Sequence, residues 1–365
     1  MSNKRVFTMD LDGKSLSVEF GELAKQASAA ALIRYDDTAV LSVSQVSKSE
    51  SHLDFFPLMI IYTEKQYAAG KIPGGFFKRE GRPSETETLS ARLIDRPIRP
   101  LFPKGYKHDI QIINTVLSGN VDRSPSVTAM FGSSLSLSLS QAPFSGPIAG
   151  VEVGRIDGEF VLNPTVGEKE LSDIDLYVAG TKHAINMVEA GALEASEADM
   201  VAAIMFGHEW IKKLIAFQEE IIADVNPEKV EFTPQDEPED LLKFVQDEAL
   251  DAIKKASAIN GRHDRGDAIG TILDDLEERY KAAHPDVSED DLKDALKTIK
   301  KLVDGAVKDE VRRLIIADEK RPDGRGLTDI RPLDSQVDIL HRTHGSALFT
   351  RGETQAFYGL QLGAL

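Results

Sequence analysis

The chain of 365 residues is long enough for two or three folded units. It contains no cysteine, which excludes disulfides, thiolate zinc sites and cysteine nucleophiles. No apolar run approaches the roughly 20 residues that a membrane-spanning helix needs, and the first residues lack the apolar core of a signal peptide. We therefore expect a cytoplasmic location and no membrane partner.

Charge is distributed unevenly along the chain. The net charge of −17 by itself argues against a nucleic-acid partner, because phosphate binding rests on Lys and Arg. Residues 71–108, however, hold nine Lys or Arg and four acids, whereas residues 231–320 hold 24 acids and 15 bases. The sequence is thus segregated into a basic patch and an acidic segment.

Turn signals in the first half predict paired strands. Asp12-Gly13 separates the alternating runs VFTMDL and SLSVEF, which is a strong hairpin signal. Asp36-Asp37 divides the apolar run AALIRYDDTAVLSVSQV in the same way, and Asp157-Gly158 divides RIDGEFVL. An antiparallel or mixed sheet is expected.

Helices are interleaved with these strands. Ser84 and Glu87 form a capping box for a helix that we expect to end at Pro97, and Ser196 with Asp199 begins another helix. This half is predicted to be α+β. The stretch SSLSLSLS alternates and by itself predicts a strand, although Ser124-Pro125 upstream is typical of a helix start.

From about Pro238 to Glu319 the pattern is helical alone. Three successive segments carry apolar residues three and four apart, and Ser288 is the expected N-cap of the last one. The Pro- and acid-rich stretch 226–240 is typical of a linker. We predict a first domain at 1–230 and an all-helical domain at 238–320.

The end of the chain repeats its beginning. When SALFTRGETQAFYG (346–359) is placed over AALIRYDDTAVLSV (30–43), three residues are identical and the strand, turn, strand pattern is shared. We expect residues 321–365 to begin a second copy of the first domain and to stop inside its early strands.

The strongest local signal for binding is the run KIPGGFFKREGR. A Gly-Gly turn places Phe76 and Phe77 at a loop tip, followed at once by three cations, Lys78, Arg79 and Arg82. Aromatic faces stack on bases while cations hold the RNA backbone. The alternative is that the phenylalanines fill a core and the cations form a solvated face.

A second group of cations follows in the predicted helix. Arg92 and Arg96 lie four residues apart on one face, with Arg99 just beyond Pro97. Asp95 can pair with Arg92, so these cations either contact phosphate or form structural ion pairs. The sequence offers no phosphate-binding Gly-rich loop, no Ser/His/Asp arrangement and no metal-ligand spacing of histidines, so we assign no catalytic and no metal-binding residue.

Two long motifs carry a family resemblance. FFKREGRPSETETLSARLIDRPIRPLFP is similar to the phenylalanine-rich loop and following helix of bacterial polynucleotide phosphorylase, and RPDGRGLTDIRPL with HGSALFTRGETQA resembles the start of that family's second core. The resemblance covers nearly the whole chain. It implies two ribonuclease PH-like cores (the ribosomal protein S5 domain 2-like fold) joined by a helical domain, the second core being truncated here. It also implies that SSLSLSLS is a packed helix.

The resemblance further implies a function. Members of the family form a three-fold ring, a homotrimer, in which paired phenylalanines thread single-stranded RNA. Here these residues are Phe76 and Phe77, flanked by Lys78 and Arg79. Lys78 stands where arginine is common, which weakens bidentate phosphate contact but keeps the charge.

The implied activity is phosphate-dependent 3′-to-5′ RNA degradation with inorganic phosphate as co-substrate and Mg²⁺ as cofactor. The phosphate- and Mg²⁺-binding residues are expected beyond Leu365. Their counterparts in the first core look degenerate, with Pro125 inside the serine turn and Gly167 where an aspartate is expected. We interpret Asp173 and Asp175 as an acidic pair at a strand edge rather than a metal site.

Two other functions stay open on the sequence. One is a non-catalytic RNA-binding ring subunit of the same fold, and the other is a scaffold built around the acidic helices with no RNA affinity. RNA-degradosome proteins are possible further partners that the family implies for the full-length enzyme.

Overall fold

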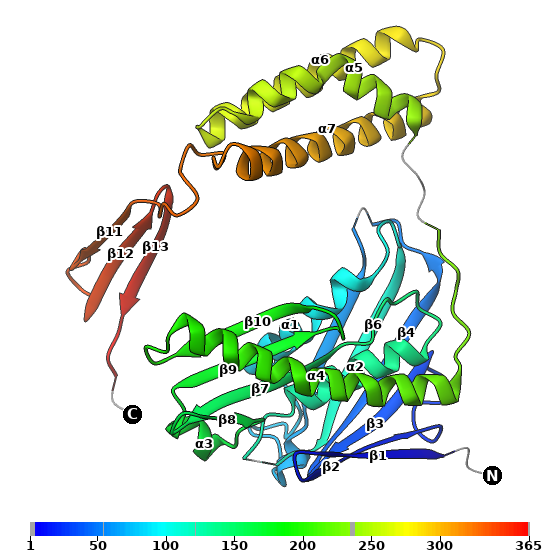
Figure 1. Cartoon of the computed structure of the whole chain (residues 1–365), viewed down its shortest axis with the longest axis vertical. Coiled ribbons are helices and arrows are strands. Elements are labelled where there is room, and N and C mark those ends of the chain that lie inside the picture. The colour runs from blue at the N-terminus through cyan, green and yellow to red at the C-terminus, as the bar shows by residue number, and fades with distance from the viewer. Residues whose placement is uncertain (1–3, 54, 121, 234–237, 364–365) are drawn as a thin grey trace. The chain divides into compact units, whose positions relative to one another are not determined.

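The computed structural model describes residues 4–53, 55–120, 122–233 and 238–363. The chain divides into two compact units, residues 1–235 and 236–365 (Figure 1). Residues 234–237 of the predicted linker lie outside the described residues.

The first unit begins with a six-stranded mixed sheet. Its strand order is β1-β2-β3-β4-β6-β5, and only the β5–β6 pair is parallel. The predicted hairpin at Asp12-Gly13 is confirmed, because both residues have positive φ (54° and 74°) and join β1 to β2. The strands are β1 (Arg5–Leu11), β2 (Lys14–Phe20), β3 (Ala29–Tyr35), β4 (Thr38–Glu50), β5 (Leu58–Glu64) and β6 (His108–Ser118).

A second, antiparallel sheet follows in the same unit. Its order is β10-β9-β7-β8, and the turn at Asp157-Gly158 joins β7 to β8 as predicted. The strands are β7 (Ala149–Ile156), β8 (Glu159–Leu162), β9 (Ile174–Gly180) and β10 (Ile185–Ala192). The helices of this unit are η1 (Gln66–Ala69), α1 (Glu85–Ile98), η2 (Arg99–Leu101), α2 (Ser126–Leu139), α3 (Val166–Leu171) and α4 (Glu197–Val225).

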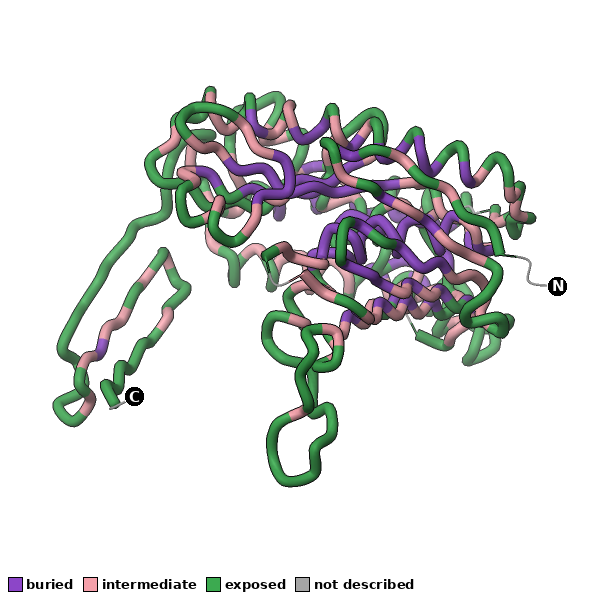
Figure 2. Tube along the Cα trace, turned by 90° about the horizontal axis from the view of Figure 1, so that it is seen from below, coloured by how far each residue is buried: buried purple, intermediate pink, exposed green. Residues whose placement is uncertain are grey.

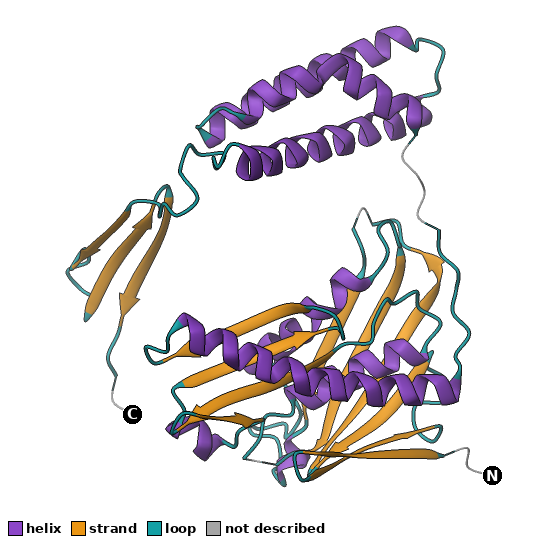
Figure 3. Ribbon diagram, viewed as in Figure 1, coloured by secondary structure: helices purple, strands orange, loops and turns teal. Residues whose placement is uncertain are grey.

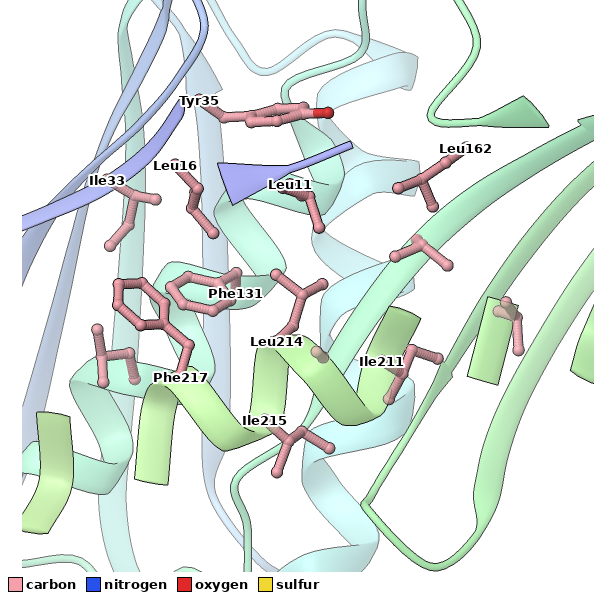
Figure 4. Packing of buried hydrophobic residues seen from close by; sticks show 14 of the residues in the cluster. Leu11, Leu16, Ile33, Tyr35, Phe131, Leu162, Ile211, Leu214, Ile215 and Phe217 are labelled. Carbon is pink, nitrogen blue, oxygen red and sulfur yellow. The ribbon is translucent and has the colours of Figure 1, made fainter. Parts of the chain in front are cut away.

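The core lies around α2, which contacts strands of both sheets. Phe131 on α2 and Phe217 on α4 stack with ring centroids 6.3 Å apart, and Ile33 of the first sheet joins the same cluster (Figure 4). Figure 2 shows the buried residues of this interior in purple and the exposed residues, many of them in loops, in green. Side chains of α2 also enter a second buried cluster, with Met130 and Leu137 beside Ile112. The packing of two sheets and helices confirms the α+β class predicted for this half.

The packed helix that the family resemblance implies for SSLSLSLS is confirmed, because residues 133–139 belong to α2, and the strand that the alternation alone predicts is wrong. The helix is buried all round, so its polar positions are not on a solvent face. Ser133 donates to Asn114 Oδ1 (2.9 Å), and Ser136 shares a hydrogen bond with Ser44 (2.7 Å). Since burial on every side removes the helical periodicity, alternation here carried no information on secondary structure.

The capping box at Ser84 is confirmed, but the end predicted for that helix is not. Ser84 Oγ accepts from Glu87 N (3.1 Å) and Glu87 Oε2 accepts from Ser84 N (2.6 Å). The helix runs through Pro97 to Ile98. A proline in the last turn removes only one terminal bond, and the buried Pro97 and Ile98 side chains hold the turn in place.

The second unit contains the helices α5 (Glu239–Ser257), α6 (Arg262–Ala283) and α7 (Glu289–Ala317), drawn in Figure 3 as separate helices joined by loops. Leu241, Val245, Ile253, Ile299 and Val303 lie in their common core. Ser288 caps α7 as predicted, its Oγ accepting from Asp291 N (3.2 Å).

A small antiparallel sheet follows, in the order β11-β12-β13. Its strands, β11 (Leu333–Val337), β12 (Gly345–Arg351) and β13 (Thr354–Leu360), pair in the register of β2, β3 and β4. Arg351 faces Thr354 as Tyr35 faces Thr38. One strand earlier, Leu333 faces Arg351 as Leu16 faces Tyr35. The shared register supports the internal repeat read from the sequence.

Candidate nucleic-acid interface

The Phe76 loop joins β5 and η1 to α1. Residues 74–86 are all exposed, and the backbone turns into the left-handed region at Gly75 (φ 76°) and Lys78 (φ 51°). A Cβ built on Gly74 or Gly75 meets no atom within 4 Å. The positive φ, and not a close approach of other atoms, therefore explains glycine at position 75. Lys78 adopts a backbone conformation that residues other than glycine rarely adopt.

The two phenylalanines stand in solvent. Phe76 is 94% exposed and Phe77 is 80% exposed, and their rings meet edge-on with centroids 5.4 Å apart. Because side chains of this size are normally buried, their exposure excludes the alternative that they fill a core of this chain. Each ring offers a free face on which a base can stack.

Four of the predicted RNA-binding cations are available to an anion. Lys78, Arg79, Arg82 and Arg92 are exposed, and none of them forms an ion pair within the described part of the chain. Because no acidic side chain of the described structure is paired with them, these four side chains can contact a phosphate backbone.

The other two cations are already bound within the protein. Arg96 pairs with Glu189 on β10 (2.6 Å). Arg99 makes a two-pronged contact with Asp95 (2.8 and 2.7 Å) and also donates to the carbonyl oxygens of Phe56 and Leu58. Asp95 therefore pairs with Arg99 and not with Arg92, the partner that the sequence offered. Arg99 lies four residues after Asp95, at the spacing that brings side chains together on one helix face.

Two acids of this region, Glu80 and Glu87, form no ion pair with its cations within the described structure and instead accept hydrogen bonds from backbone amides. Glu80 Oε1 accepts from Gln66 N (3.0 Å), and Glu87 accepts from Glu64 N (2.8 Å) as well as from Ser84 N. Burial alone would raise the pKa of Glu87, but the backbone bonds from Ser84 and Glu64 outweigh it and hold that pKa below its ordinary value. Glu87 is thus an ionised anchor.

The sequence revealed only half of the role of Glu87. Its position three residues after Ser84 predicted the capping box, but its hydrogen bond with Glu64 N joins residues 23 positions apart. No local pattern signals such a contact. Together with Arg82, these residues border a cleft of about 380 Å³ at the base of the loop, lined also by Thr63 and Lys65.

The two acids of the expected pair lie in different surroundings, Asp173 just before β9 and Asp175 within it. Asp173 receives two bonds from Arg155 (2.9 and 2.6 Å), which lower the pKa of Asp173, and Arg155 also pairs with Asp199 (3.0 Å). Asp175 is exposed. Among the described residues, no group of three His, Asp or Glu side chains is arranged to hold a metal ion.

A buried ion pair beside these strands escaped the sequence analysis. Glu152 on β7 is 2% exposed and pairs with Lys169 of α3 (2.5 Å). Burial raises the pKa of Glu152 in spite of this partner. A single acid within the apolar run IAGVEVG was the available signal. Pro125, which the sequence suggested lies inside a degenerate serine turn, occupies the N-cap position of α2 and makes no side-chain capping bond.

Comparison with known proteins defines the class to which this fold and loop belong. The family model described as "3′ exoribonuclease family, domain 1" matches residues 12–143, and the model for domain 2 of the same family matches residues 146–209. The description "Polyribonucleotide nucleotidyltransferase, RNA binding domain" matches residues 240–326. The first unit thus has the ribonuclease PH-like fold of 3′ exoribonucleases, as expected.

Individual relatives narrow the class. The chain is 53% identical over 360 residues to the polyribonucleotide nucleotidyltransferase of Exiguobacterium sibiricum, 55% identical over 362 residues to that of Bacillus velezensis and 54% identical to that of Bacillus subtilis. Each match covers 99% of this chain and 48 to 50% of the relative. The chain belongs to the polyribonucleotide nucleotidyltransferase family, and it spans about half the length of these curated relatives.

A solved structure is also similar. Rice (Oryza sativa) Rrp46 is 14% identical, with a TM-score of 0.46 over 61% of this chain and 95% of the rice chain.

Within the described ranges, no helix has both the length and the apolar character needed to cross a membrane.

Proposed function

We propose that this chain is the RNA-guiding part of a phosphate-dependent 3′-to-5′ exoribonuclease. The observation that carries the proposal is the exposed pair Phe76 and Phe77 beside cations that have no acidic partner in the described structure. Stacking tolerates any base, and phosphate contacts tolerate any sequence, so such a loop suits an enzyme that degrades RNA of many sequences. Similarity to polyribonucleotide nucleotidyltransferases over 99% of the chain supports the reaction class.

The proposed reaction of the whole enzyme shortens RNA by one nucleotide and releases a nucleoside diphosphate. Inorganic phosphate attacks the last phosphodiester, so the site must bring two anions together and stabilise them with cations. No protein nucleophile is needed.

The residues described here do not fit a magnesium site. Asp173 is held by Arg155, and no cluster of three acidic or histidine ligands occurs among the described residues. We propose that the Mg²⁺ and phosphate sites of the whole enzyme lie outside this chain. Residues 321–365 are proposed to begin the second core, in which those sites would lie.

The assembly and context are part of the same proposal. We propose a cytoplasmic homotrimer that acts in mRNA degradation, with single-stranded RNA passing the loops and RNA-degradosome proteins as further partners. The ring is supported by the fold class, since threading requires several loops around one strand.

One alternative is supported by a specific observation. Because Asp173 is committed to Arg155, the first core by itself suits a non-catalytic RNA-binding ring subunit of the same fold. Both functions predict RNA binding by the Phe76 loop, and they differ only in chemistry.

The test is an assay of phosphate-dependent release of nucleoside diphosphates from single-stranded RNA. We expect little release by the 365-residue chain and robust release when the chain is extended to the full length of its relatives. No release by the extended protein would leave the non-catalytic subunit as the function. Robust release by the 365-residue chain would refute the placement of the catalytic residues.

A further inference from the structure

The ends of the Phe76 loop are tied together by carboxylates. Glu80, within the loop, accepts from the backbone of Gln66, which precedes the loop (3.0 Å). Glu87, in the first turn of α1, accepts from Glu64 N at the end of β5 (2.8 Å) and from Ser84 N at the start of the helix (2.6 Å). One carboxylate thus bridges the last residue of the strand and the N-cap residue of the helix.

Apolar packing does not hold this loop. Residues 74–86 are all exposed, and a Cβ built on Gly74, Gly75 or Gly81 meets no atom within 4 Å. The hydrogen bonds at its base are therefore the main constraint on its conformation. Bonds to an ionised carboxylate are roughly twice as strong as those between neutral groups, and Glu87 makes two of them.

We propose that Glu87 is a positioning residue for RNA binding, which holds the loop so that Phe76 and Phe77 are presented to the strand before RNA arrives. The inference rests on the proposed function of this loop. Fixing a loop in its bound conformation strengthens binding because less disorder is lost when the ligand binds. Glu87 touches no RNA in this proposal and acts through the backbone of Glu64 and Ser84.

This role makes a prediction opposite in sign to simple electrostatics. Glu85 lies in the same helical turn as Glu87, is exposed, and forms no ion pair within the described residues. Glu85→Gln and Glu87→Gln each remove one negative charge from the same place. If charge alone mattered, both substitutions would tighten RNA binding. If Glu87 positions the loop, Glu87→Gln must weaken it.

A second control separates the loop from the helix. Ser84→Ala removes the hydroxyl that accepts from Glu87 N (3.1 Å) and so weakens the start of α1. It leaves both backbone bonds to the Glu87 carboxylate in place. An effect that arises only from loss of helix stability would appear equally in Ser84→Ala and Glu87→Gln.

The experiment measures binding of a labelled oligoadenylate by the 365-residue chain and its variants at one salt concentration, in preparations of equal oligomeric state. We expect Glu87→Gln to raise Kd by about five- to tenfold, which corresponds to about one immobilised side chain. Glu85→Gln should bind as well as wild type or more tightly, and Ser84→Ala should bind like wild type. Amide hydrogen exchange at Glu64 should accelerate in Glu87→Gln alone.

Several outcomes would overturn the inference. Wild-type or tighter binding by Glu87→Gln would do so, as would equal weakening by Glu87→Gln and Ser84→Ala. Should Glu87→Gln fail to fold, Glu80→Ala tests the second tie, and unchanged binding by that variant also refutes loop positioning. The variant Phe76→Ala/Phe77→Ala distinguishes failure of the proposed function from failure of the positioning role. If this variant binds RNA like wild type, the proposed function of the loop fails. If it binds RNA more weakly while Glu87→Gln does not, only the positioning role of Glu87 is refuted.

Discussion

Replacing Phe76 and Phe77 with alanine separates RNA contact from a structural role. Phe76 and Phe77 are 94% and 80% exposed. For side chains of about 200 Å², truncation to alanine therefore removes only about 10 and about 40 Å² of buried apolar surface. At about 25 cal/mol per Å², the expected loss of unfolding free energy is about 0.3 and about 1 kcal/mol. Two buried phenylalanines would lose about 3–5 kcal/mol each.

The effect on RNA binding should be larger than the effect on stability. Base–aromatic stacking contributes roughly 1–3 kcal/mol per base, so loss of two stacked bases should weaken binding by about 2–6 kcal/mol, at least about thirtyfold in Kd. Thermal melting and titration with single-stranded RNA measure the two quantities on the same preparation. A melting temperature far below wild type would show that the phenylalanines are structural. Unchanged melting with unchanged RNA affinity would show that they contact neither core nor RNA.

Other substitutions test neighbouring parts of the argument. Arg82→Ala should reduce the slope of log Kd against log salt by about 0.7, the value for one phosphate on a single strand, whereas Arg99→Ala should lower the melting temperature and leave that slope unchanged. Since folding holds the pKa of Glu87 below its ordinary value of 4.5, its contribution to stability is present above that pH and is lost as pH falls through the folded-state pKa. Urea unfolding of wild type and Glu87→Gln should therefore converge in acid, and a constant difference between them would contradict this. Gly132→Ala should destabilise by about 1–3 kcal/mol because its Cβ would overlap Ser42, whereas Gly266→Ala, with open space around it in a helix, should stabilise by up to about 1 kcal/mol.

Local chemistry made much of the fold readable in advance. The Asp-Gly turns and the caps at Ser84, Ser196 and Ser288 depend on residues within a few positions of one another, so the sequence contains every partner in the interaction. The repeat of the β3–β4 hairpin in β12–β13 was visible for the same reason, since turn position sets register.

Partners distant in sequence decided the rest. SSLSLSLS is a helix because surfaces from both sheets bury it on every side, and its serines find acceptors on strands far along the chain. Asp95 had cations on either side, and the carbonyl oxygens of Phe56 and Leu58 place Arg99 beside it.

The candidate site shows the same division. Its residue types, two aromatics followed by cations, were evident from the order of the chain. Whether Phe76 and Phe77 face a core or solvent, which arginines stay unpaired, and how Glu87 joins the loop to β5 depend on what the folded chain brings alongside them. Solvent exposure and pairing between distant residues are properties of the tertiary structure, because a sequence lists neighbours only along the backbone.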